Sequence, residues 1–413
     1  MKILHIITQK PNSTGSGVYM CGMINGFKKM GYNQAVIAGI DKDDNIKAFT
    51  DDISYYPVIY NSDELPFNVV GMSDVMPYKS TRYRDMDLDM VNMLKNDFRK
   101  NIKKAISEFE PDLIICHHLY LLTAFVREIV KDIQVVGICH GTCLRQIQSH
   151  DLEKEYILSN IKKLDAVFSL HDEQRKEIID IFNIDEDKAF TLGSGYDEKM
   201  FFNEVKKLNN DSITITYAGK ICKLKGLKSL INSLDKLKYH KEFININIVG
   251  DGSSKEEYEE ILELAQNNYF NINFLGKINQ EHLSKLFRKS HIFVLPSFFE
   301  GLPLVVIESL ACGCNVVTTD IPGVKQWIGD KINNSGKIGY VDLPKMKDIG
   351  IPFEKELSKF EEELANVLND MIASILSEDT RNKKLHMKDK TWTGLCYRLE
   401  NFIECNRVWC DII

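Results

Sequence analysis

Residues 292–313 read IFVLPSFFEGLPLVVIESLACG, the most informative stretch of the chain. The short apolar run Ile292–Leu295 predicts a buried strand, and Glu300-Gly301 predicts a turn. Pro303 stands in the first-turn position that proline favours, so we expect a helix over Pro303–Ala311. A strand that passes through a tight turn into a helix is the repeating unit of parallel α/β sheets.

The turn in this stretch has the chemistry of an anion site. The amides of Gly301, Leu302 and Leu304 would be free at a helix amino terminus, which favours a diphosphate. Glu300 lies in the turn and Glu308 lies two helical turns further on, so both carboxylates can face one side. A carboxylate accepts hydrogen bonds, which suits the hydroxyls of a sugar or ribose. The alternative is two solvated glutamates on a surface helix.

The same alternation of apolar runs and amphipathic segments covers most of the chain and predicts two doubly wound parallel-sheet domains. Strands of the first are expected at Lys2–Ile7, Gln34–Ala38, Ile53–Tyr60, Leu113–Cys116, Gln134–Cys139 and Ala166–Leu170. After a polar break at 206–212, a second series is expected at Ile213–Ala218, Ile244–Val249, Ile272–Leu275, Ile292–Leu295 and Asn315–Thr319. The chain then becomes helical, over Glu354–Leu376 and Thr391–Ile403. Open parallel sheets bind ligands at the carboxyl ends of their strands, so we expect the site in a cleft between the domains.

Length and charge limit the class of protein. The 413 residues are enough for two or three domains, and the net charge of 52 − 59 = −7 argues against broad neutralisation of nucleic-acid phosphates. No apolar run is long enough for a membrane span, and the amino terminus reaches Thr8-Gln9-Lys10 too soon for a signal peptide. We therefore expect a cytoplasmic protein with reduced cysteines.

Glu300 and Glu308, separated by seven residues and followed by Ala311-Cys312-Gly313, resemble the signature of retaining GT-B glycosyltransferases of family 4, within glycosyl transferases group 1. The resemblance extends from Lys2 to about Phe402. It implies an α/β fold of two Rossmann-like domains that face a cleft. Residues 1–190 would bind the acceptor and residues 191–385 the nucleotide sugar, and the helical segment 386–413 would cross back and pack on the first domain.

The resemblance also assigns a donor site. Gly15 and Gly17, in the first strand-to-helix turn, correspond to the family's glycine-rich loop; an ordinary flexible turn is the alternative. Lys220 stands where the family usually has arginine, so it lacks the bidentate fork, and solvated lysines are the alternative here. The donor-binding residues implied are Gly15, Gly17, Gly219, Lys220, Lys225, Gly250, Lys277, Ile278, Glu300, Gly301, Leu302, Pro303, Leu304 and Glu308.

His140 follows a strand of the first domain and resembles the family's His-Gly turn. The resemblance places it at the donor sugar and makes His140, Glu300 and Lys225 the catalytic set. A structural histidine is one alternative. Another is a zinc site, because two strand ends carry Cys116, His117, His118, Cys139, His140 and Cys143. The spacing matches no standard zinc motif, so we expect no metal.

The segment 71–83 is apolar, hydroxylic and basic at once. Lys79 and Arg82, with Tyr120, Thr142 and Arg145, could hold an anionic or phosphorylated acceptor, as the mycothiol-type members of the family do. A surface loop is the alternative.

The predicted reaction is transfer of a hexose or N-acetylhexosamine from a nucleotide diphosphate sugar, with a UDP-sugar as the first candidate. The configuration at the anomeric carbon is retained, and no metal or other cofactor is obligatory. Lys220, Lys225 and the helix amino terminus would stabilise the departing diphosphate. A nucleotide-sugar epimerase or hydrolase, or a non-catalytic nucleotide-sugar-binding protein, is the alternative. The expected partners are a small-molecule donor and acceptor, and no nucleic acid. The sequence leaves open the acceptor, the sugar, the base, homo-oligomer formation and peripheral membrane contact.

Overall fold

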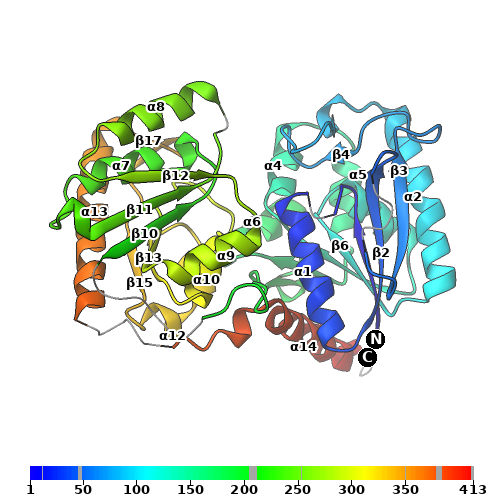
Figure 1. The fold of residues 1–413 in the computed structure, drawn as a ribbon. Coiled ribbons are helices and arrows are strands. Elements are labelled where there is room, and N and C mark those ends of the chain that lie inside the picture. Colours follow the sequence, from blue (N-terminus) through cyan, green and yellow to red (C-terminus); the bar gives the residue numbers. More distant parts are fainter. Residues whose placement is uncertain are drawn as a thin grey trace. The chain divides into compact units, whose positions relative to one another are not determined.

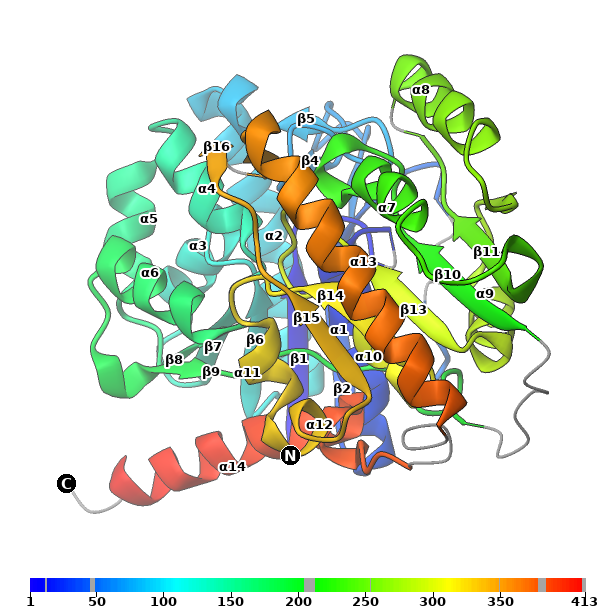
Figure 2. The same cartoon turned by 90° about the vertical axis from the view of Figure 1, so that its left-hand side faces the viewer.

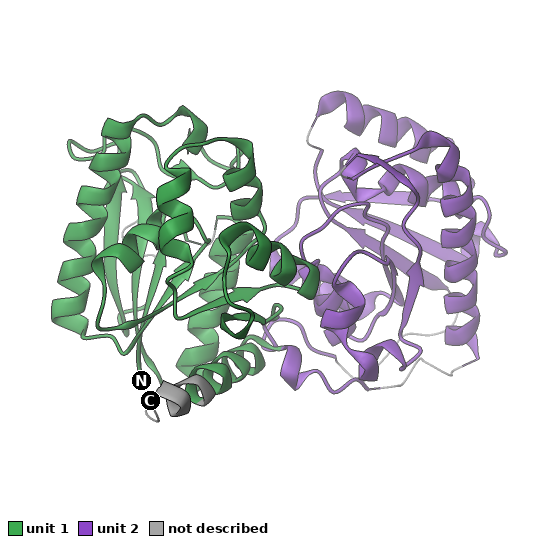
Figure 3. Ribbon diagram, turned by 180° about the vertical axis from the view of Figure 1, so that it is seen from behind, with its two compact units in different colours: residues 1–195, 391–413 green, residues 196–390 purple. Residues whose placement is uncertain are grey.

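The chain forms two compact units, each built around a parallel sheet (Figures 1 and 3). A computed structural model describes residues 1–413 except 12, 45–48, 204–211, 253, 349, 378–383 and 411–413, and except the side chains of 405–410. The first unit is Met1–Gly195 with Thr391–Ile413, and the second is Tyr196–Lys390. The predicted boundaries, at 190 and 385, stand five residues earlier. Of the polar break expected at 206–212, all but Ser212 lies outside the described residues.

The first unit contains a seven-stranded parallel sheet in the order β3-β2-β1-β6-β7-β8-β9. Its strands are β1 (Lys2–Ile7), β2 (Asn33–Asp41), β3 (Ile53–Tyr60), β6 (Leu113–His117), β7 (Gln134–Ile138), β8 (Ala166–Ser169) and β9 (Ala189–Thr191). A short parallel pair, β4 (Val70–Gly71) and β5 (Thr81–Arg82), lies at the two ends of segment 71–83, which the sequence analysis assigns to acceptor binding. The order of the strands reverses direction between β1 and β6, the kind of position where doubly wound sheets bind ligands.

Seven helices pack around this sheet: α1 (Gly15–Lys29), α2 (Leu88–Phe109), α3 (Leu121–Ile129), α4 (Thr142–Ser149), α5 (Lys154–Ile161), α6 (Asp172–Phe182) and α14 (Trp392–Cys410). Two glycines let the last of these helices approach α1 closely. A Cβ atom at Gly22 would lie 2.2 Å from the Trp392 ring, and one at Gly26 would lie 2.7 Å from the Trp392 carbonyl oxygen. The carboxyl-terminal helix therefore docks on α1, within the first unit.

The second unit contains a six-stranded parallel sheet in the order β12-β11-β10-β13-β14-β15. Its strands are β10 (Ile213–Ala218), β11 (Ile244–Val249), β12 (Ile272–Gly276), β13 (Ile292–Leu295), β14 (Asn315–Thr319) and β15 (Ile338–Val341), with a hairpin of β16 (Met346–Asp348) and β17 (Ile351–Pro352). Its helices are α7 (Leu227–Leu234), α8 (Lys255–Gln266), α9 (Gln280–Lys289), α10 (Leu304–Ala311), α11 (Val324–Ile328), α12 (Asp330–Asn333) and α13 (Glu354–Leu376). The long helix α13 crosses β14 and β15 (Figure 2).

The α/β fold class predicted from the sequence is confirmed, and six strands begin and end where predicted: β1, β3, β10, β11, β13 and β14. Six short strands (β4, β5, β9, β15, β16 and β17) and the helices α4, α11 and α12 were not predicted. Two helix starts were wrong. α1 begins at Gly15, so both glycines of the expected loop lie in its first turn, and α10 begins at Leu304, with Pro303 as its N-cap. Within the described part of the chain, no helix is both long and apolar enough to cross a bilayer.

Candidate functional site

Three strand ends of the second unit are tied together through glycine backbones. The amide of Gly219, after β10, donates to Val249 at 3.0 Å, and the amide of Gly250, after β11, donates to Gly276 at 3.0 Å. Gly250 has φ +145°, and a Cβ atom there would lie 1.9 Å from the Gly219 oxygen. Only glycine fits this contact. The positions predicted to bind the donor therefore form a continuous main-chain edge.

Two of the predicted donor lysines stand at this edge without partners. Lys220 and Lys277 are exposed, and neither forms an ion pair with any residue that the structure describes. Ile278, by contrast, packs partly buried against the core of the unit. Its side chain is structural, and only its main chain is left for a ligand.

The turn after β10 brings Lys225 to Glu300. A 3-10 turn over Lys223–Lys225 ends at Gly226, which has φ +63°. A Cβ atom at 226 would lie 2.0 Å from the carbonyl oxygen of Pro296, so glycine allows this turn to press on the segment after β13. Lys225 Nζ then lies 2.6 Å from Glu300 Oε1.

The Lys225–Glu300 pair is held in place and partly shielded. The two side chains are 21% and 17% exposed, and the Ser297 hydroxyl donates to the same Glu300 oxygen at 2.9 Å. Lys225 also lies 3.5 Å from the Phe299 carbonyl oxygen. A cation from the turn after β10 and a carboxylate from the turn before α10 are thus fixed side by side, and Glu300 lies in the turn where the sequence analysis expected it.

Helix α10 presents its amino terminus next to this pair. Its N-cap, Pro303, supplies no side-chain hydrogen bond, so the first-turn amides of Leu304 and Val305 lack an intrahelical acceptor. A Cβ atom at Gly301 would meet nothing within 4 Å, so open space adjoins this backbone. Leu302 is half-buried against the core. Free amides and the helix dipole together favour an anion here.

Glu308, on the second turn of α10, is a buried carboxyl. It is 7% exposed, and it makes no side-chain hydrogen bond with the described residues. Burial raises the pKa of Glu308 to about 8. A carboxyl held in this way without a partner is costly for the fold and is a candidate for a functional role.

In the first unit, the ends of β6 and β7 bring histidines together. His117 ends β6, and His140 follows β7 in the turn before α4. His117 Nδ1 lies 3.3 Å from His140 Nε2, and the two rings stack at an angle of 14°. His118 has φ +77° and lies edge-on to His140, as does Tyr19 from α1. The predicted sugar-binding histidine therefore sits in a cluster.

Three rings of the cluster, those of His5, His117 and His140, are uncharged at neutral pH. Burial lowers the pKa of His5 to about 4. Burial, followed by repulsion from neighbouring histidines, keeps the pKa of both His117 and His140 well below the ordinary range. These rings can therefore exchange hydrogen bonds but cannot contribute a positive charge.

The cysteines near the cluster do not complete a metal site. Cys139 and Cys143 are buried with their sulfur atoms 3.3 Å apart. Burial raises the pKa of Cys116 to about 12. Among the residues with described placement, no group of three or more His, Cys, Asp or Glu side chains is arranged to hold a metal ion. The geometry does not support the zinc alternative.

The two predicted glycines of the first unit lie at the start of α1. Thr14 caps the helix by accepting the Gly17 amide at 3.2 Å, and Gln9 donates to Thr14 and Ser16, each at 2.6 Å. A Cβ atom at Gly15 would meet nothing within 4 Å. The first turn of α1 is therefore rigidly capped, with open space beside Gly15.

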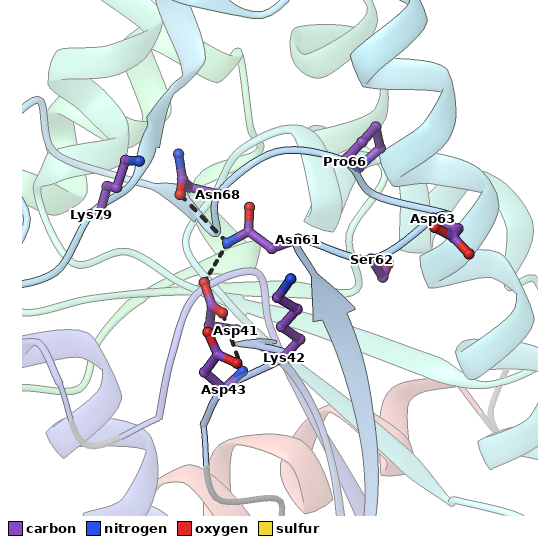
Figure 4. A pocket seen from close by; sticks show the side chains of 9 residues that line it. All are labelled: Asp41, Lys42, Asp43, Asn61, Ser62, Asp63, Pro66, Asn68 and Lys79. Atoms are coloured by element: carbon purple, nitrogen blue, oxygen red, sulfur yellow. Dashed lines mark hydrogen bonds between the residues drawn. The ribbon is translucent and has the colours of Figure 1, made fainter.

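The predicted acceptor residues have different surroundings. Lys79 lines a hollow of about 550 Å³ beyond the ends of β2 and β3 (Figure 4). Arg82 is paired with Asp85 at 2.6 Å, and Arg145 is exposed, 3.5 Å from the Ser73 hydroxyl. Thr142 is the half-buried first residue of α4. Tyr120 is 1% exposed, with its hydroxyl 3.3 Å from His150 Nε2, and so lies beneath the surface.

The hollow itself is polar and carries charges of both signs. It is lined by Asp41, Lys42, Asp43, Asn61, Ser62, Asp63, Pro66, Asn68 and Lys79. The Asn61 amide donates to Asp41 Oδ2 at 2.5 Å and to Asn68 Oδ1 at 3.5 Å, as Figure 4 shows. These bonds hold Asn61, Asp41 and Asn68 together in the lining of the hollow. Lys79 is the one residue predicted to bind the sugar acceptor that also lines it.

Sequence reasoning missed two residues that shape these sites: Ser297, which orients Glu300, and Gly226, which permits the lysine turn. It named His117 only within the zinc alternative and did not predict its hydrogen bond with His140. Ser297, three residues before Glu300, and Gly226, directly after Lys225, could have been found by asking what fixes each neighbouring charge. His117 is separated from His140 by 23 positions, and only the pairing of β6 with β7 brings them together.

The two parallel-sheet units define the fold class of this protein, the GT-B fold. The whole chain superposes on the Anabaena protein HepE, solved in complex with UDP and glucose, with a TM-score of 0.66, 15% identity and coverage of 98% of this chain and 100% of that one. Residues 198–341 match the family model of glycosyl transferases group 1. The chain therefore carries a group 1 glycosyltransferase domain on a GT-B scaffold, which confirms the group 1 resemblance found in the sequence. Its placement in family 4 stays a prediction.

Relatives by sequence agree with this assignment. Two uncharacterized glycosyltransferases of Methanocaldococcus jannaschii are 24% and 27% identical, over 54% and 70% of this chain. The aligned part spans 61% of the first relative and 77% of the second. The N-acetyl-alpha-D-glucosaminyl L-malate synthase of Bacillus anthracis is 23% identical over 80% of this chain and 82% of its own length.

Proposed function

We propose that this protein is a metal-independent retaining glycosyltransferase. It transfers a hexose or N-acetylhexosamine from a nucleotide diphosphate sugar to a small anionic acceptor, and a UDP-sugar is the first donor to consider. The donor would contact the edge formed by Gly219, Gly250 and Lys277, with Glu308 accepting hydrogen bonds from the ribose. The resemblance assigns His140 of the first unit to the donor sugar.

The observation that carries the proposal is the fixed pair of Lys225 and Glu300 beside the amino terminus of α10. The lysine and the free amides of the helix can neutralise charge that develops on a departing diphosphate. The Glu300 carboxylate can only accept hydrogen bonds, so it can orient a sugar by accepting hydrogen bonds from the hydroxyls of that sugar. Neither role requires a metal ion, and Lys220 would add a second cation.

The chemistry is a substitution at the anomeric carbon. The bond from that carbon to the β-phosphate oxygen breaks, and a bond to the acceptor oxygen forms on the same face. The departing phosphate takes the proton of the acceptor hydroxyl, so charge and atoms balance. Lys225 stabilises the leaving group, and Glu300 holds the sugar in position for attack. This front-face route is preferred because no other carboxylate is assigned the part of a nucleophile.

The names of similar proteins support the choice of substrates. HepE was solved with UDP and glucose, which is consistent with a UDP-sugar donor. The Bacillus anthracis relative is named for joining an N-acetylglucosaminyl group to L-malate, a hydroxy acid. Hydroxy acids, inositols and phosphorylated sugars are therefore the first acceptors to try.

A donor panel tests the proposal. Pure protein is incubated with UDP-, GDP- and ADP-sugars, first alone and then with those acceptors, and products are followed by mass spectrometry. Nucleotide release that needs an acceptor, with a mass-shifted product, is the expected result, and it should persist in EDTA. Retention is read from the anomeric coupling of the product by NMR. Release without an acceptor would instead mean a hydrolase or epimerase, and no release from any donor would mean a binding protein.

A further inference from the structure

His117 and His140 share one hydrogen bond, and its direction determines what His140 can offer a ligand. The atoms joined are His117 Nδ1 and His140 Nε2, 3.3 Å apart. Both rings are neutral, because burial lowers the pKa of each well below its ordinary range. Each neutral imidazole has one N–H and one bare nitrogen, so one ring donates and the other accepts.

His5, on β1, shows how such a proton is fixed in this cluster. The Gln34 amide nitrogen donates to the Ile24 carbonyl at 2.8 Å, so the Gln34 oxygen faces His5 Nε2, 3.1 Å away. That oxygen can only accept, so His5 carries its proton on Nε2. Its other nitrogen, Nδ1, is buried without a partner and holds only a lone pair.

The same reasoning applies to His117, which stacks between His5 and His140. His117 is 2% exposed, and its Nε2 is buried without a hydrogen-bond partner. A proton on Nε2 would leave a buried N–H unpaired, whereas a proton on Nδ1 leaves only an unfilled acceptor. Orphaned buried N–H groups are rarer in proteins than under-satisfied acceptors. The proton of His117 therefore belongs on Nδ1, pointing at His140.

We propose that His117 is a positioning residue that donates from Nδ1 to His140 Nε2 and so fixes the proton of His140 on Nδ1. The other groups facing His140 do not compete for this bond: the Tyr19 hydroxyl donates to the Gly193 carbonyl at 2.9 Å, and His118 presents its ring edge-on. His140 is half-buried, whereas His5, His117 and His118 are buried. Its Nδ1–H is thus the N–H left to donate to a sugar hydroxyl, a last step that rests on the proposed function.

The tautomer is measured directly by NMR on the full chain, without any ligand. Protein labelled with ¹⁵N in its histidine rings is compared with a His140→Gln variant at pH 7, which identifies the signals of His140. The expected result is a pyrrole-type Nδ1 and a pyridine-type Nε2. The opposite tautomer, or a charged ring, overturns the proposal. This readout does not depend on turnover.

Two substitutions of similar shape separate positioning from packing. His117→Asn keeps a donor near the Nδ1 position, whereas His117→Leu, of similar size, offers no hydrogen-bonding group there. We expect the Asn variant to keep the Nδ1–H form of His140 and turnover within about threefold, and the Leu variant to lose this fixed form and to lose about tenfold or more in turnover. Thermal unfolding of both variants checks the fold.

Equal loss of turnover in the two variants, with an unchanged His140 tautomer, would make His117 a structural residue only. If the unaltered protein releases nucleotide from no donor, the proposed function fails, while the NMR result still decides the direction of the bond.

Discussion

In the second unit the strand ends carry full charges, whereas in the first unit they carry neutral imidazoles. Lys225 and Glu300 stand 2.6 Å apart and remain partly in contact with solvent. His117 and His140 share a hydrogen bond inside a buried cluster, where a charge would be expensive. The two sheets have related topologies, so the difference lies in local burial and not in the fold. The comparison teaches that one type of scaffold can hold charged groups at one sheet and uncharged hydrogen-bonding groups at another, which is what the proposed contacts with a diphosphate and a sugar require.

Glu308→Gln should give the largest effect, a change in the free energy of unfolding. It tests whether the second unit, like the first, also buries an uncharged titratable group. The folded protein keeps this carboxyl protonated up to about pH 8, whereas the unfolded chain ionises it above about pH 4.5. The unfolded state therefore binds fewer protons in this window, and stability falls as the pH rises through it. At pH 9 the variant should exceed the unaltered protein by about 5 kcal/mol in free energy of unfolding, since the pKa rises from 4.5 to about 8 and each pH unit is worth about 1.4 kcal/mol.

Urea unfolding at a series of pH values from 4 to 9 measures this difference, which should vanish at the acid end. A difference that does not change with pH would contradict the burial assigned to Glu308.

Glu300→Gln removes the charge but not the shape of the paired carboxylate. We expect turnover to fall by about 10²–10³-fold, the size of effect seen when one preorganised electrostatic contact is lost. Nucleotide release in the presence of acceptor is the measurement. Glu260→Gln is the matched control: Glu260 pairs with Lys228 at 2.5 Å on exposed surface, and its loss should leave turnover unchanged. Full activity of Glu300→Gln would remove Glu300 from the site.

Two glycine substitutions compare the turns that carry the two sites. At Gly226 an alanine Cβ would strike the Pro296 oxygen at 2.0 Å in addition to the positive φ, so we expect about 2–4 kcal/mol lower stability. At Gly141, with φ +84°, the nearest atom lies at 3.4 Å, so only backbone strain of about 1 kcal/mol is expected. Urea unfolding of both variants gives the comparison. Equal losses would show that the contact with Pro296 is not tight.

The smallest effect is expected for Lys228→Gln. The Lys228–Glu260 pair is 57% and 48% exposed, so solvent screens it and its loss should cost less than about 0.5 kcal/mol. Lys225→Gln should cost more, because it leaves the partly shielded Glu300 without its cation. The two variants are compared by thermal unfolding at low and high salt. A larger loss for Lys228→Gln would reverse the ranking of the two pairs.

The sequence predicted the fold well where burial is strongest. Central strands of a parallel sheet are buried on both faces and read as unbroken apolar runs, which is why β13 was placed to the residue. β15 was missed because Gly339 interrupts a run of only four residues. β9 was missed because three residues are too few to show the alternation of apolar and polar side chains that indicates a strand. These strands lie at sheet edges, where the apolar signal is weaker.

The geometry of the candidate site was predictable where it is local. Glu300 and the turn before α10 lie within one strand-turn-helix unit, so the sequence placed Glu300 in that turn. The partner of Arg82 was within reach of the same reasoning, since Asp85 follows three residues later. The contact of His117 with His140 depends on which strands are neighbours, and the buried state of Glu308 depends on packing around α10. Neither the histidine contact nor the burial of Glu308 can be predicted from the spacing of residues along the chain.

The docking of α14 on α1 affects how the protein is made. The chain leaves the first unit at Gly195 and returns at Thr391, and the two crossing points are joined by the hydrogen bond from the Tyr196 amide to the Lys390 carbonyl. During synthesis, the Trp392 side chain that covers Gly22 emerges only after the whole second unit. The second unit can therefore fold on the ribosome while the first still waits for its last helix. The synthesis of α14, and not that of residue 195, completes the first unit.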